Sequence, residues 1–296
     1  MKSRLLQTYL MVALLSTALS GGLYGGDTSH RAGKLSRVFK RGPEQALSVD
    51  LRIGTGHLDV GVADPGVLFK GDFLYKSIPP QIAHELVGNK ARISIRVGSK
   101  TRKEKEEPEN VDFSLSGLFK DESILRFTSE IPITMTMRLG AVKGFLELGG
   151  LRLQSVSMEV GVSQCLVNFA QPNPETLSLF NVEAGVGKLE MLNLANAGFQ
   201  HLVFKGGMGS YVLDFGGELV RSGEVDIEVG MGSLTLYLPE EVGVRVEVDK
   251  NLFTALNIDD VYKKGNVYYN NHWGKTSQQL DVHLEAGFGK IDIIWK

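Results

Sequence analysis

Pairs of glycines separated by a single residue recur along the chain, and this repeat constrains the fold more than any other feature. The clean copies, each followed by alternating apolar residues, are Gly54 with Gly56, Gly185 with Gly187, Gly207 with Gly209, Gly230 with Gly232, and Gly287 with Gly289. When weaker copies headed by Gly140 and Gly161 are included, the leading glycines from 140 to 230 stand 21, 24, 22 and 23 residues apart. A period in this range is typical of a solenoid, whose repeats bury their apolar faces only by stacking on one another.

The apolar positions change parity within each repeat. In one copy they are Ile227 and Val229 before the second glycine, and Leu234 and Leu236 after it. A β-strand presents every second residue to the same face, and it cannot change that face without an extra residue or a corner. We therefore interpret the second glycine of each pair, for example Gly187, as a bulge or bend that re-aims the chain.

The patterns predict an all-β protein, a stacked β-coil solenoid with an N-terminal β-strand region. Residues 46–98 alternate as strands, with a turn signal at Asp64-Pro65-Gly66. The interval of 57 residues between Gly230 and Gly287 indicates an insertion. The predicted organisation is a signal peptide (1–20), a linker (21–45), the N-terminal β region (46–132) and the solenoid (133–296), with the insertion at about 240–280.

The first residues have the pattern of a secretory signal peptide. Lys2 and Arg4 precede an apolar run over residues 5–19, and Ala18 and Ser20 occupy the −3 and −1 positions of a cleavage site. The run is shorter than the ~20 apolar residues of a spanning helix, which favours cleavage over a retained anchor. We expect an exported protein of the periplasm or cell envelope.

Composition narrows the class of partner. The net charge of −2 provides no global field for a nucleic acid, so no nucleic-acid partner is expected. A single cysteine, Cys165, excludes an internal disulfide. Because Cys165 occupies the repeat position of Leu189 and Leu234, we interpret it as a small buried apolar residue and not as a reactive thiol.

Several short motifs, in their order, resemble the bacterial toast-rack families of uncharacterised exported proteins, which are related to the C-terminal domain of cell-wall-active antibiotic response proteins. They include Gly54-Thr55-Gly56-His57-Leu58, Phe69-Lys70-Gly71-Asp72-Phe73, Leu148-Gly149-Gly150-Leu151 and Leu238-Pro239. The resemblance covers most of residues 46–296. It implies a right-handed, β-helix-like stack of β-coils and a link to envelope stress or wall maintenance, and it carries over no catalytic residues.

The sequence contains no motif that predicts a catalytic residue, a cofactor or a metal site. The Gly-x-Gly pairs lack the third glycine, the following helix and the Lys-Ser/Thr of nucleotide-binding loops. The six histidines form no His-x-His or His-x-x-x-His pair. Gly161-Val162-Ser163-Gln164 departs from a nucleophile elbow because Cys165 replaces the final glycine.

A charged residue precedes each leading glycine by two positions. These residues are Arg52, Arg138, Glu159, Glu183, Lys205, Glu228 and Glu285. Equivalent positions of stacked strands lie about 4.8 Å apart, so we expect a ladder on the outer face. We favour a solvated charge ladder; a paired-carboxylate hydrolase site at Glu159 and Glu183 is the alternative.

Two further surfaces are candidates for contacts. Tyr262, Tyr268, Tyr269, His272 and Trp273 cluster in the insertion, where they can cap an open solenoid end or contact a sugar or peptide. We favour capping. Basic residues within 31–41 can either touch anionic lipid as a peripheral membrane contact or form a charged tether; they are Arg31, Lys34, Arg37, Lys40 and Arg41.

These observations favour a non-catalytic exported envelope protein that binds or scaffolds an envelope protein or glycan. The alternative is a glycan-active hydrolase or lyase that uses the Arg138–Glu159–Glu183–Lys205 ladder, because stacked β-coils host such sites elsewhere.

The signal-peptide interpretation predicts that residues 1–20 are absent from the mature protein. Mass spectrometry of the exported protein should give an N-terminus at Gly21. A mass that still includes Met1 would contradict cleavage.

Overall fold

The computed structural model describes residues 32–98, 120–250, 254–258 and 261–296, so the predicted signal peptide lies outside it. The described chain is all-β apart from one 3-10 turn, η1 (Leu194–Ala197), and its strands form one 16-stranded sheet. The strands are β1 (Gly33–Lys40), β2 (Ala46–Val62), β3 (Val67–Tyr75), β4 (Gln81–Val87), β5 (Lys90–Val97), β6 (Glu122–Phe127), β7 (Ile133–Glu147), β8 (Leu153–Asn168), β9 (Leu177–Leu192), β10 (Phe199–Asp214), β11 (Gly223–Leu238), β12 (Gly243–Lys250), β13 (Thr254–Ile258), β14 (Tyr262–Lys264), β15 (Val267–Tyr269) and β16 (Gln279–Trp295).

Seven long strands of 15 to 17 residues form the body of the protein. They are parallel neighbours in the order β2, β7, β8, β9, β10, β11 and β16. Equivalent repeat positions lie side by side: Glu183 is opposite Lys205, and Lys205 is opposite Glu228. The sequence period therefore determines the register of the stack.

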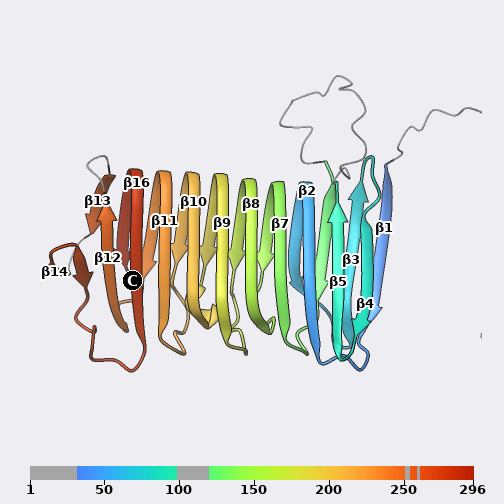
Figure 1. The fold of residues 1–296 in the computed structure, drawn as a ribbon, viewed down its shortest axis with the longest axis horizontal. Helices are drawn as coiled ribbons and strands as arrows, with labels where there is room; N and C mark the ends of the chain where they lie inside the picture. Colours follow the sequence, from blue (N-terminus) through green and yellow to red (C-terminus); the bar gives the residue numbers. More distant parts are fainter. Residues whose placement is uncertain (1–31, 99–119, 251–253, 259–260) are drawn as a thin grey trace, which may run out of the picture.

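Each long strand bends at its glycine pair, or at the equivalent positions in β7 and β8, and the bend separates two layers. Figure 1 shows the two halves of each strand one in front of the other, joined at the upper edge, which we call the bend edge. We call the opposite edge, which carries the loops between repeats, the loop edge. Ile227 and Val229 before the bend, and Leu234 and Leu236 after it, are all buried in the single apolar core between the layers.

The glycines of neighbouring repeats form two columns in which backbones approach closely. The leading column contains the first glycine of each pair, and the second column contains the second glycine. In the leading column, a Cβ on Gly207 would lie 2.5 Å from the carbonyl oxygen of Gly185. In the second column, Gly232 has a φ of 131°, and a Cβ there would lie 1.9 Å from the oxygen of Gly209. Both a side chain and an ordinary L-residue conformation are disfavoured at Gly232.

The second position of the pair requires glycine for different reasons in different strands. Gly187 has a φ of 132°, and a Cβ on Gly187 would lie 2.1 Å from the carbonyl oxygen of Ser163, so it is restricted both by its conformation and by its neighbour. Gly209 is not among the residues of positive φ, although a Cβ there would lie 2.1 Å from the oxygen of Gly187. The bend at Gly209 therefore requires the close approach and not the left-handed conformation, and Ser163 occupies the equivalent bend of β8 without a positive φ.

The two ends of the stack replace the bent strand with two separate strands. At one end, β5 pairs with the first half of β2 and β6 pairs with its second half. At the other end, β12 and β13 pair with the two halves of β16. The insertion predicted at about 240–280 thus supplies the terminal repeat, and the last strand in the sequence lies inside the stack.

Antiparallel strands cover most of the outer edges of these terminal repeats. β4 pairs with β5, and β3 followed by β1 extends from β6. At the other end, β15 and then β14 extend from β12.

Two of the predicted boundaries are wrong. Residues 33–40, assigned to the linker of residues 21–45, form β1, and its Leu35 and Phe39 pack against the core. The predicted boundary between the β region of residues 46–132 and a solenoid of residues 133–296 is not a structural break. The strand β2 pairs with β7 from Leu47 opposite Ile133 to Val60 opposite Leu146, so it is a full member of the stack.

The close approach at the bends predicts a large cost for a side chain at Gly232. Gly232→Ala should destabilise the fold by about 3 kcal/mol, because backbone strain and overpacking add. The control is Gly265→Ala, since Gly265 has a φ of 67° but nothing within 4 Å of an added Cβ. The free energy of unfolding of the Gly265→Ala variant should fall by only about 1 kcal/mol. Urea unfolding of both would measure the difference, and equal losses would mean that the contact between repeats is unimportant.

Candidate functional surface

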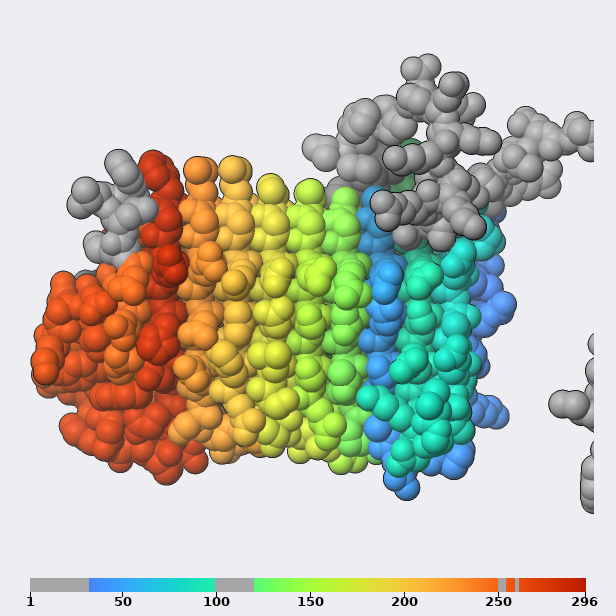
Figure 2. Space-filling view, viewed as in Figure 1, coloured from blue at the N-terminus to red at the C-terminus, as the bar shows by residue number. Residues whose placement is uncertain are grey.

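The charged residues predicted to form a ladder lie side by side across the first halves of the long strands. Neighbours in register include Arg138 with Glu159 and Glu159 with Glu183. Arg138 Nε lies 3.6 Å from Glu159 Oε2, and Lys205 Nζ lies 3.4 Å from Glu228 Oε2. These four side chains are roughly half-exposed. We call this outer surface, which Figure 2 views directly, the ladder face.

The ladder is longer than the sequence indicates, and its charge changes along the stack. Arg96 of β5 is opposite Arg52, and Asp249 of β12 is opposite Glu285. From β5 to β12 the order is Arg96, Arg52, Arg138, Glu159, Glu183, Lys205, Glu228, Glu285 and Asp249. The face is therefore basic at one end and acidic at the other. Sequence reasoning missed the two terminal members because β5 and β12 carry no glycine pair.

A shallow trough runs beside the ladder. Its volume is about 760 Å³, and its lining combines ladder residues with the leading glycines from Gly54 to Gly230. Since the glycines carry no side chains, the floor is flat backbone over several strands. The trough fits an extended ligand better than a compact one.

Glu159 and Glu183 lie at neighbouring positions, as the hydrolase alternative requires, but their setting does not resemble a glycosidase site. Glycosidases place two carboxyl groups on either side of the scissile bond and keep one of them protonated in an apolar environment. Here both side chains rise from one open face, both residues are exposed, and Glu159 is ion-paired with Arg138.

An acidic region with paired cations lies at the β12 end of the ladder face. Arg245 donates a hydrogen bond of 2.8 Å to Asp281, and hydrogen bonding by Arg245 lowers the pKa of Glu247. His201 lies 2.7 Å from Asp226. Within the described ranges, no group of three His, Cys, Asp or Glu side chains is placed to hold a metal ion.

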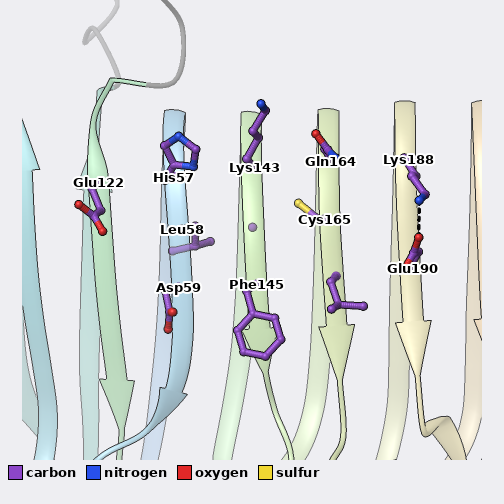
Figure 3. Close-up of a pocket in the computed structure, with 12 residues that line it drawn as sticks. His57, Leu58, Asp59, Glu122, Lys143, Phe145, Gln164, Cys165, Lys188 and Glu190 are labelled. Atoms are coloured by element: carbon purple, nitrogen blue, oxygen red, sulfur yellow. Dashed lines mark ion pairs between the residues drawn. The ribbon is translucent and has the colours of Figure 1, made fainter. Parts of the chain in front are cut away.

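A second hollow of about 600 Å³ lies on the opposite layer, just below the bend edge. Figure 3 shows His57, Lys143, Gln164 and Lys188 in a row across neighbouring strands. Cys165 is buried, its Sγ lies 3.7 Å from the carbonyl oxygen of Val142, and burial raises its pKa to about 11. Because Cys165 is inward-facing and His57 is exposed, the two do not form a nucleophile and base.

The aromatic residues of the insertion separate into two places. Tyr262 and Tyr269 stack at 5.6 Å in the β14–β15 hairpin, and Tyr268 beside them is 8% exposed. This hairpin lies at the outer edge of β12, where a cap would be. His272 and Trp273 instead lie in the turns at the loop edge, before β16 begins.

The basic residues within 31–41 do not form one patch. β1 begins at the bend edge and ends at the loop edge, so Lys34 lies near the bend edge and Lys40 near the loop edge. Arg41 is engaged at the loop edge, 3.0 Å from Glu44 and 3.3 Å from Glu130. Arg31 lies outside the described residues.

A stack of bent parallel strands with glycine columns at the bends defines a class of repetitive all-β proteins. The chain belongs to the toast-rack family: residues 28–192 match the family model described as the N-terminal domain of toast_rack, DUF2154. The resemblance inferred from the short motifs is thereby confirmed. The match ends with β9, whereas the strand register continues unchanged through β10, β11 and β16.

Comparison with solved structures gave matches that include the following three. A candidate cell adhesion protein from Clostridium sporogenes is 20% identical with a TM-score of 0.49, covering 90% of this chain and 100% of its own. A candidate adhesin from Bacteroides fragilis is 11% identical with a TM-score of 0.32, and the match covers 88% of this chain and 97% of the adhesin. A candidate adhesin from Parabacteroides merdae is 8% identical with a TM-score of 0.37, and the match covers 89% of this chain and 96% of the adhesin. Comparison with curated proteins found no similar sequence.

The environment of Cys165 predicts an unreactive thiol. With a pKa of about 11, Cys165 is about 0.1% thiolate at pH 8, whereas a free cysteine of pKa ~8.5 is about a quarter thiolate. Alkylation by iodoacetamide at pH 8 should therefore be at least a hundredfold slower, on the order of the thiolate ratio, in the native protein than in 8 M urea. Equal rates would place the thiol on the surface.

Proposed function

We propose that this protein is a non-catalytic, exported component of the cell envelope that binds or scaffolds a partner along its ladder face. The observation that carries the proposal is the unbroken row of charges from Arg96 to Asp249, beside a flat glycine-floored trough. Such a surface offers many equivalent weak contacts and no single enclosed pocket.

The partner we infer is elongated and polar, either an envelope protein or a glycan, and not a nucleic acid. Nine strands at about 4.8 Å spacing make the row about 38 Å long. An extended molecule of complementary charge order gains a contact at each strand. We also infer a right-handed solenoid winding of the strands.

The arrangement of charges argues against hydrolysis as the main activity. Glu159 forms an exposed ion pair with Arg138 on an open face, whereas a general acid needs a raised pKa and a position across the substrate from the second carboxylate. Glu159→Gln with Glu183→Gln should change stability by less than about 0.5 kcal/mol, because a lost like-charge contact offsets a lost surface ion pair.

Charge reversal at the basic end of the ladder tests the proposal. In a strain lacking the gene, Arg52→Glu with Arg138→Glu should fail to restore resistance to envelope stress, because the partner meets the wrong charge. Lys263→Glu with Lys264→Glu, on exposed β14, is the matched control and should restore it. Circular dichroism would establish that both variants are folded.

Wall glycan provides the opposing test. The purified wild-type protein should release no reducing ends from it. If it releases sugar and the Glu159→Gln, Glu183→Gln variant does not, the ladder is an active site and the binding proposal fails.

A further inference from the structure

A row of apolar side chains projects from the bend edge. The residue between the two glycine positions of a strand is opposite its counterpart in the next strand. Thr55 of β2 begins this row, and from β7 to β16 its members are apolar: Ala141, Val162, Val186, Met208, Met231 and Phe288. The last five are between 46% and 52% exposed. We call these six residues the apex row.

The apex row is exposed because of its position at the bends. Each member lies between two columns that are mostly glycine, and the larger members keep about half of their surface exposed. Figure 2 shows a row of protrusions along this upper edge, over β7 to β11. Contiguous apolar surface on a protruding edge indicates contact with something other than water.

Lysines accompany the apex row. Lys143, Lys188 and Lys290 follow the apex residue of their strands by two positions. The acids that pair with Lys188 and Lys290 are Glu190 and Asp292, two residues farther from the edge. The lysines therefore stand between the apolar row and these carboxylates. On the ladder face, Glu159, Glu183 and Glu228 are three positions from the apex.

The end of the stack near β1 adds cations to the same edge. Lys34, Lys76 and Lys120 are exposed residues near the bend-edge ends of β1, β3 and β6. Gly33, the first residue of β1, is opposite Tyr75 at this edge.

The dimensions of the row favour a lipid surface over a second copy of the chain. Six positions at about 4.8 Å form a strip about 24 Å long and one residue wide. A standard protein interface buries about 800 Å² on each partner, more than so narrow a strip provides. A bilayer needs no complementary shape, and apolar side chains flanked by lysines are the composition that binds at its interface.

We propose that the bend edge docks on an anionic lipid bilayer. The apex row enters the headgroup layer, and the neighbouring lysines contact lipid phosphates. The proposal rests on the envelope location proposed above but not on the ladder-face partner, since the two surfaces have different residues.

Vesicle binding by the exported protein tests this docking. The wild type should sediment with phosphatidylcholine–phosphatidylglycerol (1:1) vesicles, less with pure phosphatidylcholine, and less at high salt. Met208→Ser with Met231→Ser and Phe288→Ser should weaken binding at least tenfold. The control, Leu86→Ser with Leu179→Ser and Val220→Ser, removes residues of similar exposure away from the bend edge and should change binding less than twofold.

Fluorescence quenching reports the orientation independently of affinity. Both native tryptophans, Trp273 and Trp295, lie toward the loop edge, so brominated lipids should leave their emission unchanged. In Phe288→Trp, the added emission should be quenched on brominated vesicles.

Either of two vesicle results would overturn the proposal: no binding by the wild type, or equal binding by the triple apex variant. Quenching of the native tryptophans, without quenching of the tryptophan introduced by Phe288→Trp, would also overturn it. So would light scattering that shows a wild-type dimer and a monomeric apex variant. The last result would assign the apex row to a second copy. None of them bears on the charge-reversal experiment for the ladder face.

Discussion

The carbonyl oxygen of one bend lies against the α-carbon of the next bend, and the rest of the structure depends on this contact. A Cβ on Gly287 would lie 2.5 Å from the oxygen of Gly230, and one on Gly289 would lie 1.8 Å from that of Gly232. At the leading position all seven long strands carry glycine, because a side chain there would prevent this approach; at the second position β7 and β8 have Val142 and Ser163 instead. Because the bends stack in this way, the strands on both sides run in parallel register, and the two layers close on one core.

The same register that buries the inward residues aligns the outward ones. Alternate residues of a strand face opposite sides, so a fixed alignment of Val229 with Ala286 also fixes Glu228 beside Glu285. The ladder and the apex row are therefore consequences of the repeat, and what varies between repeats is the side chain placed on each row. Function in such a protein resides in the order of residues along a row.

The ends of the stack show how a repetitive sheet is terminated. A parallel stack exposes unpaired backbone groups at each end, which invites association with further strands. Here antiparallel strands cover both ends of the layer that carries the ladder, β4 at one end and β15 with β14 at the other. The terminal strand β4 is almost entirely exposed and carries charged residues such as Glu85, as protected edges commonly do.

The sequence by itself determined the all-β class, the repeat period, the parity change at Gly187 and Gly232 and the row that runs from Arg52 to Glu285. These are local properties, because a two-residue alternation and a nearly constant spacing require no knowledge of distant partners. The sequence did not reveal β1, because this strand lies in a polar segment with few apolar residues on its inward face.

Only the tertiary structure decided that β5 with β6 and β12 with β13 act as terminal repeats, because the two strands of each pair are joined through a break that carries no glycine pair. Only it placed β16 inside the stack, extended the ladder beyond the glycine repeats and set the apex residues on one edge. Strand order and edge exposure arise from pairings between residues far apart in the chain, which no local pattern encodes.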